Sequence, residues 1–149
     1  MKTDPVLSTV EEENKSKVRM FYETVINQAK FDLLPKLLDQ KVVWHDPLLP
    51  QREARGPVAF RTVLETFRYA FPDLRITVQD MFAKNDHVTT RFIINATHLG
   101  DLMGIPGTGK QVQVSGISII RFEKGRIVEE WIEEDGLGLM RQLGVLPNV

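Results

Sequence analysis

The chain has 149 residues, of which 42% are hydrophobic and 26% are charged, and its formal net charge is −1. These values predict one folded domain and exclude a disordered or low-complexity chain. The sequence contains no cysteine, which excludes disulfide frameworks, thiolate metal sites and cysteine nucleophiles. The balanced charge gives no electrostatic reason to expect binding to nucleic acid or to an anionic membrane.

The N-terminal segment does not have the pattern of an export signal. Asp4 and Pro5 interrupt it before any apolar stretch begins. No apolar run in the chain approaches the roughly 18–20 residues of a membrane-spanning helix. We therefore expect a cytoplasmic protein without membrane contact, with a flexible N-terminal tail over residues 1–8 and a single domain over residues 9–149.

Three helices are predicted in the first half of the chain, with one short strand between the second and the third. Apolar residues at helical spacing, from Val10 to Ile26, predict an amphipathic first helix that Ser8 or Thr9 caps. The next two helices each have a proline in the first turn, where its missing N–H group costs little. The expected elements are helices over residues 9–28, 32–39 and 57–71 and a strand over residues 41–46.

The second half of the chain has the pattern of strands. After residue 74 the apolar residues recur with period two, and Lys124-Gly125 is a hairpin signal between two such segments. A glycine-rich loop over residues 100–110 reads as a lid, and helical spacing returns over residues 137–143. Helices that precede a long antiparallel sheet predict an α+β fold, in which a curved sheet and its covering helices can enclose a pocket.

A series of short motifs follows a fixed order from the first helix to the C-terminal segment. They are Phe21-Tyr22-Glu23 with Asn27, His45-Asp46-Pro47, Gly56-Pro57, Ala70-Phe71-Pro72-Asp73-Leu74, Thr97-His98-Leu99-Gly100, Gly104-Ile105-Pro106, Thr108-Gly109-Lys110, Gly125-Arg126-Ile127-Val128-Glu129, Trp131, Asp135, Gly138-Leu139 and Gln142-Leu143-Gly144. Over residues 10–146 the chain resembles the SnoaL-like polyketide cyclases of the nuclear-transport-factor-2-like superfamily. The resemblance implies a cystatin-like α+β cone, with three N-terminal helices packed on a curved antiparallel sheet around an apolar pocket.

The resemblance also implies an activity. Characterised members of the family close a polyketide ring by an intramolecular aldol reaction, in which a carboxylate removes a carbon-bound proton without metal or organic cofactor. We therefore expect an enzyme of this type, acting on a bulky apolar or aromatic ketone. A related isomerase or dehydratase, a small-molecule-binding protein without turnover and an interaction module remain alternatives, because a widely reused fold does not determine function.

Asp135 is the first catalytic candidate. Five acidic residues lie between positions 129 and 135, and crowding beside an apolar wall raises the pKa of at least one carboxyl group. Alternation along a strand puts Trp131, Glu133 and Asp135 on one face, which we interpret as the pocket face because of the tryptophan. The resemblance implies that Asp135 is the acid/base, with Glu133 as the fallback, since Ile132 stands where related sequences often carry an acid. A solvated strand edge or an N-cap of the last helix is the alternative.

His98 is the second catalytic candidate, at the end of a strand whose same face carries Phe92, Ile94 and Ala96. From there its imidazole could donate a hydrogen bond to a developing enolate oxygen or orient Asp135. The alternative is a structural histidine that bonds to the following loop.

The remaining candidates form a predicted aromatic pocket without metal or cofactor. His45 and Asp46 point to opposite faces of their strand, and three scattered histidines without cysteine do not form a metal-ligand set. Apolar Ile117 and Ile119 on the outer sheet face predict a homodimer or homotetramer. The expected substrate-pocket residues are Tyr22, Trp44, His45, Asp46, Phe60, Phe67, Met103, Trp131 and Glu133.

Overall fold

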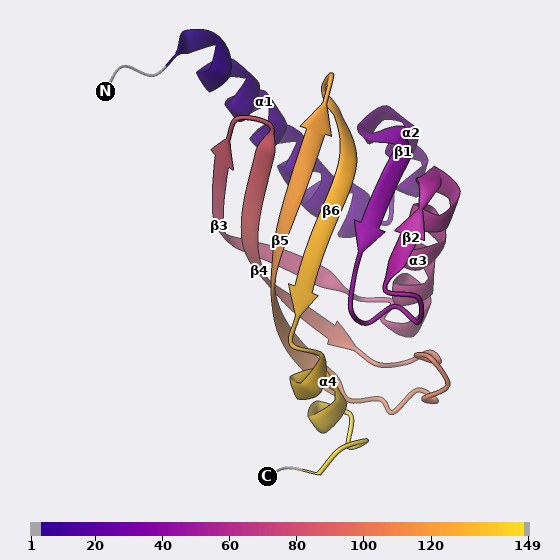
Figure 1. Ribbon diagram of the computed structural model, residues 1–149. Helices are drawn as coiled ribbons and strands as arrows, with labels where there is room; N and C mark the ends of the chain where they lie inside the picture. The colour runs from indigo at the N-terminus through magenta and orange to yellow at the C-terminus, as the bar shows by residue number, and fades with distance from the viewer. Residues whose placement is uncertain (1–3, 148–149) are drawn as a thin grey trace.

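The computed structural model describes residues 4–147, and Figure 1 shows a curved sheet with helices on one side. The elements in chain order are α1 (Pro5–Met20), a π-helix (Phe21–Ile26), a 3₁₀-helix (Phe31–Leu33), α2 (Leu34–Leu37), β1 (Leu38–His45), β2 (Glu53–Arg55), α3 (Gly56–Ala70), β3 (Arg75–Lys84), β4 (His87–Thr97), β5 (Gln111–Glu123), β6 (Arg126–Glu134) and α4 (Gly136–Gln142). The predicted α+β class is confirmed. Within residues 4–147 no helix is both long and apolar enough to cross a membrane.

The helices differ from the predicted three N-terminal ones. Residues 4–147 contain four α-helices, of which α2 is only four residues long and α4 follows the sheet. The start of the first helix at residue 9 is also wrong: Asp4 accepts a hydrogen bond from the backbone N–H of Val6, and Pro5 occupies the first turn. The predicted tail is thus helical from Pro5 onward, and residues 1–3 lie outside the described residues.

The six strands form one sheet in the order β2-β1-β6-β5-β4-β3. Neighbouring strands are antiparallel except β1 and β6, which are parallel, so the predicted wholly antiparallel sheet is wrong at this pair. Strand β6 pairs with β1 although β3, β4 and β5 lie between them in the sequence. No hairpin therefore constrains the direction of β6 relative to β1. Short β2 was also missed, because its three residues, Glu53–Arg55, are too few to show a strand pattern.

A π-helix continues α1 directly and positions aromatic side chains over the sheet. Asn27 donates from its backbone N–H to Tyr22 over five residues (3.0 Å), and Lys30 donates to Val25 in the same way (3.0 Å). Four of the six side chains in this segment are buried. Such π segments occur often at functional sites. This one brings Phe21 and Tyr22 to the interior.

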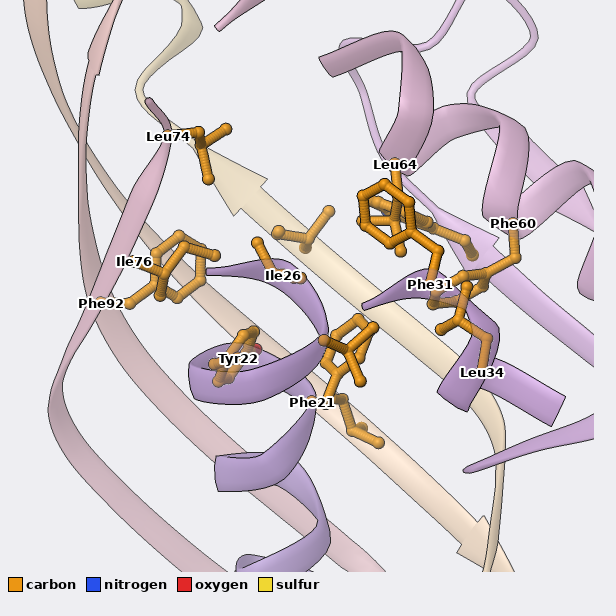
Figure 2. Packing of buried hydrophobic residues seen from close by; sticks show 14 of the residues in the cluster. Phe21, Tyr22, Ile26, Phe31, Leu34, Phe60, Leu64, Leu74, Ile76 and Phe92 are labelled. Atoms are coloured by element: carbon orange, nitrogen blue, oxygen red, sulfur yellow. The ribbon is translucent and has the colours of Figure 1, made fainter. Parts of the chain in front are cut away.

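The core fills the space between the sheet and the helices, as Figure 2 shows. Tyr22 packs against Phe92 of β4 with ring centroids 5.8 Å apart, and Phe21 packs against Phe60 of α3 at 5.9 Å. Gly116 of β5 makes room for Phe92, because a Cβ atom there would lie 2.5 Å from the phenylalanine ring. Irregular register in β3 and β6 accompanies the curvature, as expected of β-bulges.

Candidate active site

A cavity lies between the inner face of the sheet, the π-helix and α3. Its volume is about 710 Å³, which includes the open mouth. A bulky ligand would therefore fill the mouth as well as the interior. The wall is aromatic and aliphatic, and its ionisable residues are Tyr22, Glu130 and Glu134. Such a wall, with a few converging polar groups, is typical of small-molecule sites.

Strand β6 presents the opposite face to the cavity from the one predicted. Glu130, Ile132 and Glu134 line the cavity, whereas Trp131 is 37% exposed and Glu133 is exposed on the outer side. The prediction that the face of Trp131 is the pocket face was wrong, because the Trp131 indole lies flat against the ring of His45 on the outer face (centroids 5.5 Å apart). A single-residue error of phase along a strand exchanges every inward and outward side chain.

Glu130 and Glu134 are the acidic groups of the cavity. Burial, followed by the nearby charge of Asp46, raises the pKa of each carboxyl to about 8. Glu134 also raises the pKa of Glu130, and the Oε2 atom of Glu130 is buried without a hydrogen-bond partner among the described residues. The pair is poised to hold or release a proton near neutral pH.

Tyr22 adds a hydroxyl beside this pair. Its Oη atom shares a hydrogen bond of 2.5 Å with Oγ of Ser118, and both residues are buried. Burial, followed by the charge of Glu130, raises the pKa of the phenol well above its ordinary value. Tyr22 therefore stays neutral and can donate or accept a hydrogen bond, as predicted for a pocket residue.

The structure does not bring Asp135 into the cavity. Asp135 is exposed, and its side chain accepts a hydrogen bond of 2.8 Å from the backbone N–H of Gly138, at the start of α4. This is the geometry of the alternative stated above, in which Asp135 is the N-cap of the last helix.

His98 is fully buried, but it is not among the residues that line the cavity. Its Nδ1 atom accepts a hydrogen bond from the backbone N–H of Thr108 (3.2 Å) and lies 3.0 Å from Oγ1 of the same residue. Backbone bonds with Lys110 and Gly109 add to this connection. The geometry is that of the structural alternative, in which His98 holds the glycine-rich loop against the sheet.

The predicted substrate-pocket residues do not all line the cavity. Tyr22, Trp44 and Phe67 line the cavity, and Phe60 packs behind Trp44 with ring centroids 4.7 Å apart. Met103 is 47% exposed in the loop. The remaining four line a separate, polar pocket on the outer side of the sheet edge, of about 520 Å³ including its opening; they are His45, Asp46, Trp131 and Glu133.

Comparison with known proteins identifies the family of this chain. Residues 16–143 match the family described as SnoaL-like polyketide cyclase. The chain belongs to this family. The match covers every element from the second half of α1 to α4, and therefore includes both carboxyl groups of the cavity.

Several relatives of this SnoaL-like protein come from Streptomyces species. Aklanonic acid methyl ester cyclase DnrD of Streptomyces peucetius is 32% identical over 119 residues, which cover 79% of this chain and 82% of DnrD. The structure of IdmH from Streptomyces antibioticus, provisionally described as a polyketide cyclase, superimposes with a TM-score of 0.76 and 29% identity, covering 89% of this chain and 99% of IdmH. AclR from Streptomyces galilaeus, provisionally described as a hydroxylase, gives a TM-score of 0.81 and 27% identity, covering 93% of this chain and 89% of AclR.

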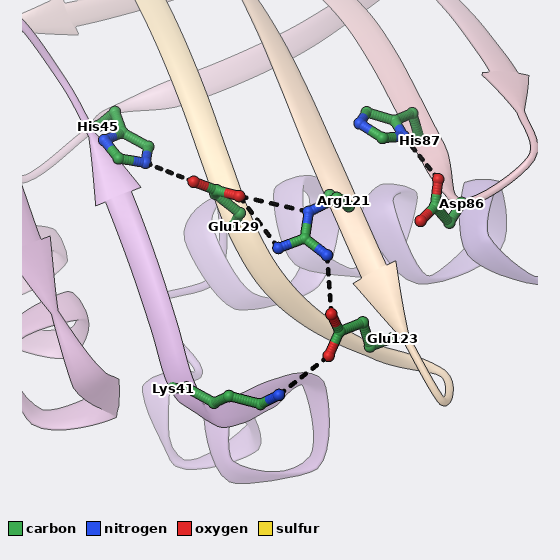
Figure 3. Close-up of polar contacts among 7 residues, drawn as sticks. All are labelled: Lys41, His45, Asp86, His87, Arg121, Glu123 and Glu129. Atoms are coloured by element: carbon green, nitrogen blue, oxygen red, sulfur yellow. Dashed lines mark hydrogen bonds and ion pairs between the residues drawn. The ribbon is translucent and has the colours of Figure 1, made fainter.

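On the outer face of this SnoaL-like protein, charged side chains are linked in a series of ion pairs (Figure 3). Glu129 accepts hydrogen bonds from Nε2 of His45 (2.8 Å) and from Arg121 (3.1 Å), and Arg121 also pairs with Glu123 (2.9 Å), which pairs with Lys41 (3.1 Å). Burial opposes ionisation of Glu129, but the bonds from His45 and Arg121 lower its pKa overall. His45 and Glu129 therefore have a structural role on the outer face.

The described part of the chain offers no metal centre: within residues 4–147, no three histidine, aspartate or glutamate side chains gather in a group that could hold a metal ion.

Sequence reasoning missed Glu130 and Glu134, although one signal pointed to them. Ile132 is the only aliphatic residue between positions 129 and 135, and it belongs on the buried face. If Ile132 faces the interior, Glu130 and Glu134 also face the interior, because side chains alternate along a strand. The large indole of Trp131 outweighed this signal in the prediction.

Proposed function

We propose that this SnoaL-like protein is a cofactor-independent cyclase that closes a ring in a small polyketide by an intramolecular aldol reaction. The observation that carries the proposal is the pair of buried carboxyl groups, Glu130 and Glu134, on the wall of an apolar cavity. The name of the relative DnrD, an aklanonic acid methyl ester cyclase, supports this reaction class. A pair of coupled carboxyl groups that titrates near neutral pH is suited to general acid–base catalysis.

The two carboxyl groups take complementary parts in the proposed reaction. Glu134, the less enclosed of the two, loses its proton as the pH approaches its pKa of about 8, and in this ionised form it removes a proton from the acidic carbon of the substrate. The resulting carbanion attacks a ketone carbon of the same molecule and forms the new C–C bond. Glu130, which is wholly buried and neutral, donates its proton to the ketone oxygen, which becomes a hydroxyl. The substrate is isomerised, and no atom is gained or lost.

The composition of the cavity wall favours a flat, apolar substrate. Five aromatic side chains from the π-helix, β1, α3 and the residue after α3 line the cavity with the carboxyl pair; they are Phe21, Tyr22, Trp44, Phe67 and Phe71. Offset stacking on such rings favours a flat substrate, and a water-poor wall strengthens the interactions of the carboxyl groups with the reacting atoms.

The test replaces each carboxyl group by its neutral amide. Aklanonic acid methyl ester is the first substrate to assay, and both ring closure and exchange of the acidic carbon-bound proton in heavy water are followed. Because general acid–base catalysis contributes about 10²–10⁴-fold, Glu134→Gln should lower both rates by that order, whereas Glu130→Gln should lower ring closure more than exchange.

Glu133→Gln is the matched control, since it removes an exposed carboxylate of the same strand on the opposite face. Asp135→Asn tests the residue favoured by sequence and should keep turnover within about threefold of wild type, because its carboxylate only caps α4. Unchanged ring closure in both Glu130→Gln and Glu134→Gln would refute the assignment. Tight binding of the ester without ring closure in the wild type would instead indicate a binding protein.

We also propose that the outer sheet face joins two copies of the chain. Ile117, Ile119 and Trp131 are 50%, 38% and 37% exposed there. Apolar side chains on an exposed sheet are typical of a subunit contact. Light scattering at micromolar concentration should give the mass of a dimer or larger assembly, and Ile117→Lys should give the monomer mass. A monomer in the wild type contradicts the proposal.

A further inference from the structure

Asp46 is a buried carboxyl group that the proposed reaction does not yet use. It directly follows β1 and is only 1% exposed. Its backbone N–H donates to the carbonyl of Arg52 (3.0 Å), and its Oδ1 atom accepts from the backbone N–H of Leu48 (2.8 Å). Its Oδ2 atom is buried without a hydrogen-bond partner among the described residues. The backbone therefore holds this carboxyl group in place and leaves one oxygen free.

The position of Asp46 lies between the cavity and the outer polar pocket. In the parallel register Trp44 stands opposite Glu130 and His45 opposite Trp131, so Asp46 comes beside Ile132, which separates the two glutamates. Glu130 and Glu134 are then the diagonal neighbours of Asp46, with Cα atoms about 7–8 Å away, a separation that long side chains and one bridging water can span. Consistent with this, the charge of Asp46 raises the pKa of both Glu130 and Glu134.

Asp46 also forms part of the outer polar pocket. Asp46 and Ile132 both belong to the wall of the outer pocket, and Ile132 also belongs to the wall of the cavity. The outer pocket is polar, with Arg52, Glu53 and Glu133 in its wall, whereas the cavity is mostly apolar. Asp46 is thus the charged residue that separates a water-accessible pocket from the buried pair.

A proton route of this kind meets a need of the proposed reaction. After one ring closure Glu134 holds the proton from the substrate carbon, and Glu130 has lost its own proton to the new hydroxyl. Before the next turnover Glu134 must lose a proton and Glu130 must gain one. The net change is the return of one proton from Glu134 to Glu130, and while a bulky ligand in the mouth keeps bulk water from the cavity side, a carboxyl group beside both glutamates offers a route that does not wait for the ligand to leave.

We infer that Asp46 is a proton-relay residue that connects Glu130 and Glu134 with water in the outer pocket. The need for the relay rests on the proposed function. Its carboxylate accepts the proton from Glu134 and releases it to outer water, and the proton that restores Glu130 returns through the same carboxyl group. Charge and protons balance over one cycle. Burial, partly offset by the hydrogen bond from Leu48, raises the pKa of Asp46 toward that of its partners, which favours transfer between them.

The first test measures proton access without any substrate. Infrared spectra after rapid mixing into heavy water follow deuteration of the buried, protonated carboxyl groups through the shift of their carbonyl stretch. Asp46→Asn keeps an oxygen that can accept from Leu48 and removes the titrating group. We expect deuteration to slow at least tenfold in Asp46→Asn and to stay at the wild-type rate in Asp135→Asn, the control that removes an exposed carboxylate outside both pockets. Equal deuteration rates in wild type and Asp46→Asn would overturn the inference.

The second test separates the relay from a merely structural role during turnover of aklanonic acid methyl ester. In Asp46→Asn the first turnover should proceed within about threefold of the wild-type rate, while steady-state kcat falls by tenfold or more. Formate added to Asp46→Ala should restore part of the steady-state rate through the outer pocket. Equal loss in the first and in later turnovers, or no rescue by formate, contradicts a relay.

The two proposals fail in distinguishable ways. Full cyclase activity in Glu130→Gln and Glu134→Gln removes the proposed function, yet the infrared experiment still decides whether Asp46 gives protons access to the pair. Conversely, loss of activity in both glutamine variants with unchanged deuteration in Asp46→Asn keeps the function and removes the relay.

Discussion

Replacing Glu130 by glutamine should change how the stability of the fold depends on pH. Burial raises the pKa of Glu130 from 4.5 to about 8, so between these values the folded state holds a proton that the unfolded chain has released. The unfolded state binds fewer protons in this window, and the free energy of unfolding therefore falls as pH rises. Below pH 4.5 both states are protonated and this group contributes no pH dependence.

The magnitude follows from the size of the shift. Each pKa unit corresponds to about 1.36 kcal/mol, so the wild type should lose about 3 kcal/mol through this group by pH 7 and about 4 kcal/mol by pH 8, relative to acid pH. Glutamine has nearly the same shape and does not ionise. Glu130→Gln should therefore lack this loss, and its stability relative to wild type should increase steadily from pH 5 to pH 8.

Urea unfolding followed by tryptophan fluorescence measures the effect at pH 5, 6, 7 and 8. The slope with pH is compared rather than the absolute stability, because the introduced side-chain amide adds a buried donor whose cost does not vary with pH. Glu133→Gln, on the exposed face, should retain the wild-type slope. Parallel curves for wild type and Glu130→Gln would show that Glu130 is ionised in the folded protein, and would refute the acid/base argument built on its burial.

Three further substitutions test how the fold supports the site. Gly116→Ala should destabilise the protein by about 1–3 kcal/mol in urea unfolding, because the new Cβ atom would press on the ring of Phe92, and a smaller loss would show that the ring can move aside. Asn27→Ala should cost about 2 kcal/mol, since its side-chain amide bonds both the N–H and the carbonyl of Ile76 (2.7 and 2.9 Å), whereas an unchanged midpoint would mean that water replaces both bonds. Asp135→Ala should cost about 1 kcal/mol through loss of the α4 N-cap, and ring closure reduced a hundredfold would restore Asp135 as the catalytic candidate.

Local patterns along the chain were enough to predict the fold class and most element positions. The helix over residues 57–71 and the strands after residue 74 follow from hydrophobic period, proline position and a hairpin signal, and the structure confirms α3 and β3 to β6 in these places. The family resemblance likewise rests on short motifs whose order the sequence displays, and the family match confirms it. These features depend on neighbours within a few residues of each other.

Tertiary structure decided which side of β6 faces the cavity. Glutamates occur at positions 129, 130, 133 and 134, so both faces of the strand are equally acidic in the sequence. The choice depends on the parallel pairing with β1 and on the core under Ile132, which involve residues far apart in the chain. Burial then gives Glu130 a raised pKa, while Glu129, one residue earlier, meets Arg121 and ionises readily. The sequence supplied several carboxyl groups of equal chemistry, and only the packed sheet made them different, because desolvation and ion pairing depend on the surroundings in space.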